Sequence, residues 1–145
     1  MKLLIQRVSF ANITINSDIE KKMEYGLLVY LGIKKDDDYT NIDKAINKLL
    51  KLRFFENEEG KLKKNIKDIN GSIMVVSSFS LYAKADKGTT LSFDDSANHE
   101  LAQKIYDKFV ENLKIEYDKV VTGKFKSDMD IISNATGPVN VILEF

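Results

Sequence analysis

Three serines end an apolar segment in the middle of the chain, and their hydroxyl groups are the best placed for chemistry. Ser77, Ser78 and Ser80 follow the run from Ile73 to Val76, which is typical of a buried strand. A strand end can expose hydroxyl groups and free backbone N–H groups, which are the components of an oxyanion site. Serines are also common as simple polar termination of a strand, so both interpretations stay open.

The second candidate is the segment from Ala135 to Asn140, which contains the only proline of the chain. Gly137 and Pro138 separate two apolar, strand-like segments. A glycine followed by proline is most often an ordinary turn. The alternative is a cis peptide bond, found in about 5 to 6% of bonds before proline, which directs a carbonyl group where a trans chain cannot.

Few other residues could act as catalysts. The chain has no cysteine, which excludes thiol nucleophiles and thiolate metal sites and suits a reducing cytosol. His99 is the only histidine, and no local motif identifies a serine partner for it, so we expect a surface or helix-capping role. We expect no metal and no cofactor, because neither a metal-ligand cluster nor a nucleotide-binding motif is present.

Charge and hydropathy narrow the class of protein. The 22 basic and 22 acidic residues cancel, so no overall positive field attracts nucleic acid. Residues 44–67 nevertheless carry eight basic and three acidic side chains, either as a solvated helix face or as a patch that contacts phosphates. No apolar run approaches the roughly 20 residues that cross a bilayer, so we expect no membrane insertion and a cytoplasmic location.

The strands that position the candidate residues are predicted by hydrophobic periodicity. Residues 2–10 and 11–16 alternate apolar and polar side chains and are predicted to pair as a hairpin. Residues 25–33 are almost continuously apolar, as in a central strand covered on both faces. Two further strands are predicted at residues 129–133 and 139–145, on either side of the proline.

Two amphipathic helices complete the prediction. Apolar residues recur every three or four positions in residues 41–54. The same pattern follows the candidate caps Ser96 and Asn98 and ends near Tyr117. We therefore predict that residues 1–145 form a single α+β domain with a mainly antiparallel sheet and two helices.

Taken together, these segments resemble the D-aminoacyl-tRNA deacylase family, also called the D-tyrosyl-tRNA deacylases. The resemblance covers nearly the whole chain, in the family's order and spacing. The segments that carry it are QRV, GLLVYLGI, LRFFENEEGK, IKDINGSIMVVSSFSLYA, KG at Lys87 and Gly88, ELAQKIYDKFVENL, TGKFKSDM and GPVN.

The resemblance implies a barrel-like α+β fold and a homodimeric enzyme without metal or cofactor. The implied substrate is the ester between a D-amino acid and the 3′ end of tRNA. The resemblance also implies that the enzyme acts on glycine mischarged onto alanine tRNA. In the family the active sites lie at the subunit interface. A Ser-Gln-Phe-Thr strand end forms one wall of each active site. The Gly-Pro loop of the partner subunit, which has a cis bond, forms the other wall, and its main-chain carbonyl groups select the D over the L amino acid.

The family's site residues carry over to two groups of positions. The catalytic wall is expected to comprise Ser77, Ser78, Phe79 and Ser80, with Phe79 offering its backbone N–H to the ester carbonyl. Ser78 stands in place of the family's glutamine, and Ser80 in place of its threonine.

The chirality-selective loop is expected to comprise Gly137, Pro138 and Val139. Arg7, on the first strand, matches an arginine that supports this loop. Asn140 stands where the family has threonine. Two alternatives stay open: a diverged member that binds tRNA or another nucleic acid without hydrolysing the ester, and a deacylase of relaxed chirality with a trans Gly-Pro bond.

Overall fold

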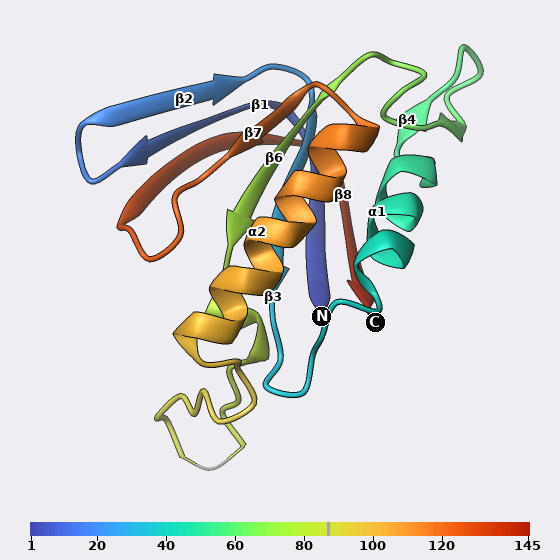
Figure 1. Cartoon of the computed structure of the whole chain (residues 1–145). Coiled ribbons are helices and arrows are strands. Elements are labelled where there is room, and N and C mark those ends of the chain that lie inside the picture. The colour runs from blue at the N-terminus through green and yellow to red at the C-terminus, as the bar shows by residue number, and fades with distance from the viewer. Residues whose placement is uncertain (87) are drawn as a thin grey trace.

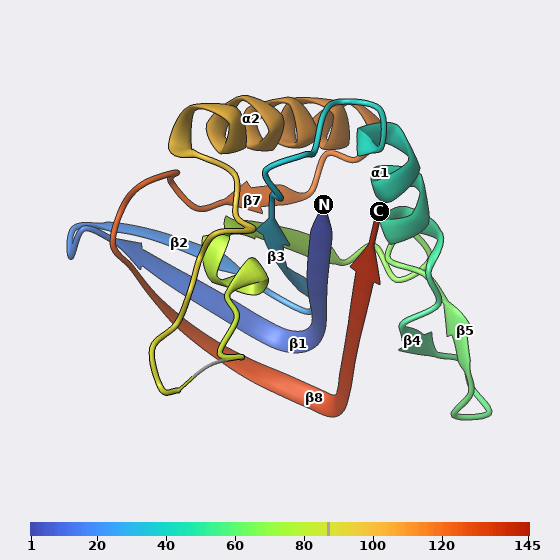
Figure 2. The ribbon, with the colours of Figure 1, turned by 90° about the horizontal axis from the view of Figure 1, so that it is seen from below.

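The structure is a computed structural model that describes residues 1–86 and 88–145. Lys87, one of the residues that carry the family resemblance, lies outside the described part. A six-stranded sheet curves beneath two helices, which pack on the same side of it (Figures 1 and 2). The predicted α+β class and barrel-like sheet are confirmed.

The sheet is built around one long strand. Strand β1 (Lys2–Ile15) pairs antiparallel with β3 (Gly26–Gly32), with β2 (Ile19–Met23) and, along its other edge, with β8 (Met129–Glu144). Strands β6 (Ser72–Ser77) and β7 (Val120–Thr122) extend the sheet from β3 in parallel pairing, which the sequence did not predict. A separate small hairpin consists of β4 (Phe55–Glu56) and β5 (Leu62–Lys64).

The predicted hairpin within residues 2–16 is wrong. These residues form the single strand β1, because no glycine, proline or asparagine stands at the expected break between Phe10 and Ala11 to reverse the chain. The chain reverses instead at Asn16 and Ser17, both with positive φ (50° and 60°), and Ile15 then pairs with Ile19. Asparagine and serine favour such turns.

The two strands predicted on either side of Pro138 are also one strand, β8. Its register against β1 shifts between Gln6 and Val8 and again between Val8 and Ala11. Both strands bend sharply in Figure 2. Proline is tolerated here because, in the part of the chain that the structure describes, β8 pairs with β1 alone, so the missing N–H breaks no ladder on its other edge.

The helices are close to their predicted positions. Helix α1 (Ile42–Lys51) buries Ile42, Ala45, Ile46, Leu49 and Leu50. Helix α2 (His99–Glu116) begins at the predicted cap, where the Asn98 side chain accepts a hydrogen bond from the Leu101 N–H at 2.9 Å. Both helices cover the sheet face that carries Leu3, Val29 and Val75, which closes the main core. No helix in the described residues is long and apolar enough to span a membrane.

Candidate functional site

The serine-rich segment follows the carboxyl end of β6. Ser77 pairs with Leu31 of β3, and the Ser78 N–H donates to the Leu31 carbonyl at 2.9 Å. The chain then forms a short 3₁₀ helix, η1 (Phe79–Tyr82), with the Ser78 and Ser80 hydroxyl groups 3.1 Å apart. Gly32, at the end of β3, allows η1 to pack closely against this strand, because a Cβ at Gly32 would lie 2.9 Å from the Cβ of Leu81.

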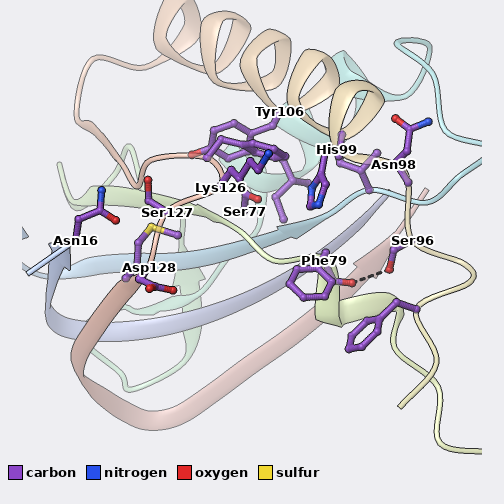
Figure 3. Close-up of a pocket in the computed structure, with 17 residues that line it drawn as sticks. Asn16, Ser77, Phe79, Ser96, Asn98, His99, Tyr106, Lys126, Ser127 and Asp128 are labelled. Carbon is purple, nitrogen blue, oxygen red and sulfur yellow. Dashed lines mark hydrogen bonds between the residues drawn. The ribbon is translucent and has the colours of Figure 1, made fainter. Parts of the chain in front are cut away.

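A pocket of about 740 Å³ opens beside this segment, between the sheet and the start of α2 (Figure 3). Ser77 and Phe79 line it, together with His99 and Tyr106 of α2. The first residue of β8 and the residues just before it form the opposite side. They are Phe125, Lys126, Ser127, Asp128 and Met129, with Asn16 from the turn after β1.

Two hydrogen bonds fix the walls of this pocket. The Ser96 hydroxyl donates to the Phe79 carbonyl at 2.9 Å and ties the segment before α2 to η1 (Figure 3). The buried Tyr106 hydroxyl donates to the Val75 carbonyl at 3.1 Å. Burial raises the pKa of Tyr106, with a smaller contribution from Asp107, so its hydroxyl stays a neutral donor.

An exposed aromatic pair stands at the rim of the pocket. The rings of Phe79 and Phe93 are 4.9 Å apart between centroids. Both are unusually exposed for phenylalanine, at 58% and 38% of their surface. Exposed aromatic faces next to a polar pocket can stack on nucleotide bases or pack against another protein.

The Gly-Pro segment lies at the bend of β8, beside Arg7. The Gly137–Pro138 peptide bond is cis. Arg7 is 6% exposed; its Nε donates to the Thr136 carbonyl at 3.2 Å and its Nη1 to the Phe54 carbonyl at 3.0 Å. This guanidinium therefore links the β8 bend to the β4–β5 hairpin.

A single chain does not bring the two candidate segments together. Asn140 pairs with Gln6, Gln6 with Leu28, and Leu28 with Met74, so β8 and β6 are about 14 Å apart across the sheet. Ser77 lies about 10 Å further along β6 from Met74, in the direction away from the Gly-Pro segment. The pocket accordingly contains Ser77 and Phe79 but no residue of the Gly-Pro segment.

Sequence reasoning missed several pocket residues. His99 was expected at the surface or as a cap, and it is exposed, yet it also lines the pocket. Lys126 and Asp128 lie in the segment TGKFKSDM, which carries the family resemblance, but neither they nor Asn16 were identified as site residues, because only the folded sheet brings their turns near β6. Among the described residues, no group of three His, Asp or Glu side chains is arranged to hold a metal ion.

Known proteins that are similar in sequence to this chain over nearly its full length include several that are named as deacylases of one family. Residues 4–144 match the family model described as D-Tyr-tRNA(Tyr) deacylase. A D-aminoacyl-tRNA deacylase of Finegoldia magna is 44% identical over 144 residues, which covers 99% of this chain and 97% of that protein. The D-aminoacyl-tRNA deacylase of Aquifex aeolicus is 39% identical, with the same coverage.

Two solved structures share the fold. One, titled "c-Myc DNA Unwinding Element Binding Protein", has a TM-score of 0.93 and 32% identity, and the match covers 100% of this chain and 99% of that one. The other is described as a probable eukaryotic D-amino acid tRNA deacylase. It has a TM-score of 0.88 at 15% identity over 98% of this chain and 97% of that one, and it supports the fold alone.

Proposed function

Because this chain belongs to the D-aminoacyl-tRNA deacylase family, we propose that it is an enzyme that hydrolyses the ester between a D-amino acid and the 3′ end of tRNA. The observation that carries the proposal is the 44% identity to the Finegoldia magna deacylase over nearly the full length of both chains. The pocket beside Ser77 and Phe79 offers a place for the ester. Since charged tRNA is a cytoplasmic molecule, we place the reaction in the cytoplasm.

The chemistry asks little of the protein beyond orientation and stabilisation of charge. Water attacks the ester carbonyl, and the backbone N–H of Phe79 binds the oxyanion that forms. The bond between the carbonyl carbon and the ribose oxygen then breaks, and the proton from water goes to the ribose oxygen. An aminoacyl ester is an activated bond, so positioning and oxyanion stabilisation supply the rate without a strong base from the protein.

The hydroxyl groups of Ser77, Ser78 and Ser80 complete this wall. Ser78 and Ser80 lie within hydrogen-bonding distance of each other, at 3.1 Å. In place of the family's longer glutamine and of its threonine, this pair offers two short hydroxyl groups to the terminal ribose. We therefore expect the ribose to approach η1 closely.

The second wall comes from Gly137, Pro138 and Val139, held in place by Arg7. Main-chain carbonyl groups of this segment bind the α-amino group of the substrate and leave no room for an L side chain. Selection by the main chain suits an enzyme that must accept many different side chains. Glycine has no side chain to exclude, so we propose that glycine mischarged onto alanine tRNA is also a substrate.

The two walls meet only if two copies of the chain associate, so we propose a homodimer with an active site at each end of its interface. The separation of β6 and β8 within one chain supports this arrangement. The Thr136 hydroxyl, next to Gly137, supports it too, since it is buried without a hydrogen-bond partner among the described residues. A buried hydroxyl without a partner is costly unless another group reaches it.

An apolar row on the sheet face opposite the helices offers the contact area. Tyr30, Leu4 and Ile142 lie side by side on neighbouring strands, and Ile142 is 65% exposed. Ile132, on the same open edge strand, is 66% exposed. A long edge strand with exposed isoleucines is usually covered by another chain.

The test is hydrolysis of D-Tyr-tRNA, L-Tyr-tRNA and glycyl-tRNA by the purified protein, with a chelator present. We expect rapid loss of the D-tyrosyl and glycyl esters and little loss of the L-tyrosyl ester. Equal hydrolysis of the D and L esters would contradict the proposed role of the Gly-Pro segment. Hydrolysis that a chelator abolishes would contradict the metal-free mechanism.

A second function is favoured by one observation. The protein titled "c-Myc DNA Unwinding Element Binding Protein" is 32% identical and has nearly the same fold. A nucleic-acid-binding role without hydrolysis would give salt-dependent binding of tRNA or DNA while the D-tyrosyl ester remains intact.

A further inference from the structure

Helix α1 presents an exposed stripe of three lysines. Lys44, Lys48 and Lys51 are spaced by four and three residues, so they lie on one side of the helix. We call this group the α1 stripe. All three line a groove of about 510 Å³ between α1 and the C-terminal end of β8, two segments that lie side by side in Figures 1 and 2.

The lysines of the α1 stripe have few partners in the described part of the chain, apart from the Phe145 ring, whose centroid lies 5.8 Å from the Lys44 ammonium group. Among the described residues, none of its three lysines forms a salt bridge. The one carboxylate side chain that lines the groove, Glu144, lies 3.7 Å from Lys2. Like charges at these spacings repel each other, but Lys48 and Lys51 lie in the last turn of α1, where the helix dipole favours positive charge. Lys44, near the other end of the helix, gains nothing from the dipole, so the stability of α1 does not explain the whole stripe.

Helix α2 shows the ordinary arrangement for comparison. Lys104 lies 2.7 Å from Glu100, and Lys108 lies 2.9 Å from Glu111, each on the same helix face. Two of the three lysines of α2 are therefore paired, and Lys114 is the exception, whereas none of the three lysines of the α1 stripe has a salt-bridge partner among the described residues. This difference points to an anionic partner for α1.

The α1 stripe also leads toward the proposed active site. Its Lys51 end is followed by Arg53 and Phe54, and the Phe54 carbonyl accepts a hydrogen bond from Arg7. Arg7 in turn holds the Thr136 carbonyl beside Gly137. An anionic ligand that runs along α1 would thus extend toward the Gly-Pro segment.

We propose that Lys44, Lys48 and Lys51 bind the phosphate backbone of the base-paired stem of the tRNA whose 3′ end occupies the active site. From Lys44 to Lys51 the helix rises about 10 Å, a length over which one nucleic-acid strand presents about three phosphates. This inference rests on the proposed function, since it assigns a contact to the same substrate. It gives the enzyme affinity for tRNA that does not depend on the amino acid.

The experiment compares a triple variant, K44A/K48A/K51A, with the control K104A/K108A/K114A on α2. Each removes three positive charges. Both are assayed on D-Tyr-tRNA and on D-tyrosyl-adenosine, which has the ester but no stem. We expect the α1 variant to lose at least tenfold in kcat/KM on the tRNA, mostly through KM, with the loss on the adenosine ester below twofold.

Salt dependence gives a second measurement. The slope of log(kcat/KM) on tRNA against log salt concentration should become shallower by about two to three in the α1 variant, because each lost phosphate contact removes close to one unit. The α2 control should keep the slope of the unchanged protein. Equal losses on both substrates, equal behaviour of the two triple variants, or an unchanged slope would overturn the inference.

Failure of the proposed function can be told apart from failure of this inference. If the unchanged protein hydrolyses neither ester, binding of uncharged tRNA is measured by fluorescence anisotropy. Weaker binding by the α1 variant than by the α2 control then supports a contact between the α1 stripe and tRNA, even if the protein is not a catalyst. Equal binding by both variants excludes an RNA contact and leaves an acidic protein surface as the partner to seek.

Discussion

The guanidinium of Arg7 lies so close to Gly137 that a Cβ built on this glycine would be 2.7 Å from Nη2 and 2.9 Å from the Val139 Cγ2. Gly137 also has φ of +112°, a conformation that other residues rarely adopt. The position therefore requires glycine for two independent reasons, the backbone angle and the lack of space.

Gly137→Ala should lower both stability and activity. The strained φ alone costs about 1–3 kcal/mol, and the displaced Arg7 should move the carbonyl groups of the loop. We expect a lower Tm and at least a tenfold loss of kcat/KM on D-Tyr-tRNA. Gly60→Ala is the matched control, because Gly60 has φ of +73° but open space around it. It should lower Tm and leave hydrolysis intact.

Arg7→Lys should weaken the enzyme although the charge is kept. Lysine cannot donate to the Phe54 and Thr136 carbonyls in the same planar geometry, so one buried acceptor is left without a partner. We expect a loss of about 1–3 kcal/mol in stability and a reduced preference for the D over the L ester.

The control for Arg7 is Glu56→Gln. This carboxylate lies 3.5 Å from the Arg7 Nη1 but is 53% exposed, so the ion pair contributes at most about 1 kcal/mol. Its removal should leave the ratio of D to L hydrolysis unchanged. If Glu56→Gln changed that ratio as much as Arg7→Lys, charge rather than hydrogen bonding would position the loop.

Phe79→Pro tests the proposed backbone donor directly. Phe79 is the first residue of η1, and Ser78 before it is extended, with φ of −144° and ψ of 97°, so proline fits both conformations. The substitution removes the N–H. Hydrolysis should fall about 100- to 1,000-fold, with thermal stability nearly unchanged.

Phe79→Ala is the companion variant, because it removes the ring and keeps the N–H. It should lose much less in kcat than Phe79→Pro. Equal kcat in the two variants would show that the ring, not the backbone, carries the effect.

Mixing two inactive variants tests the shared active site. Subunits with Phe79→Pro and subunits with Gly137→Ala are unfolded together, refolded and assayed. Half of the dimers formed by random association contain both variants, and each of these has one site with two intact walls. Activity should recover to about a quarter of that of the unchanged protein. No recovery, in a preparation that is dimeric by size, would mean that both walls come from the same subunit.

Tyr106→Phe should affect stability more than chemistry. The variant loses the hydrogen bond to the Val75 carbonyl, at a cost of about 1 kcal/mol, since that carbonyl still accepts from the Gly123 N–H. Burial raises the pKa of Tyr106 above the value of about 10 in the unfolded chain. Stability is therefore lost as pH rises past about 10, and Tyr106→Phe should make this alkaline decline less steep, as measured by denaturant unfolding.

The two helices could be predicted because the residues that identify each helix lie within the helix or next to it. The apolar spacing within 42–51 and the Asn98 cap each identify a helix without knowledge of the rest of the chain. The order of the sheet could not be predicted in this way. The parallel pairing of β3 with β6 joins residues about 45 positions apart, and no residue in either strand identifies the other as its neighbour.

The errors at β1 and β8 have different causes. Gly137 and Pro138 have the composition of a turn, yet β8 continues through them, because no strand of residues 1–86 and 88–145 pairs with its outer edge. In β1 the prediction placed a turn between Phe10 and Ala11, although no glycine, proline or asparagine stands there.

The serines after β6 and the Gly-Pro pair stood out by their residue types at strand ends. Arg7, Phe79 and Val139 were proposed only by resemblance, because nothing in their own spacing marks them.

The Gly-Pro segment is held inside a strand, with paired residues before it at Val8 and Ala135 and after it at Gln6 and Asn140. Side chains alternate between the two faces of a strand, so one added residue here would turn Ile142 toward the helices and Leu143 away from them. The length of this segment is thus fixed by the core that lies beyond it. A substitution in this segment keeps the pairing on both sides of it, whereas an insertion would disrupt the sheet beyond it.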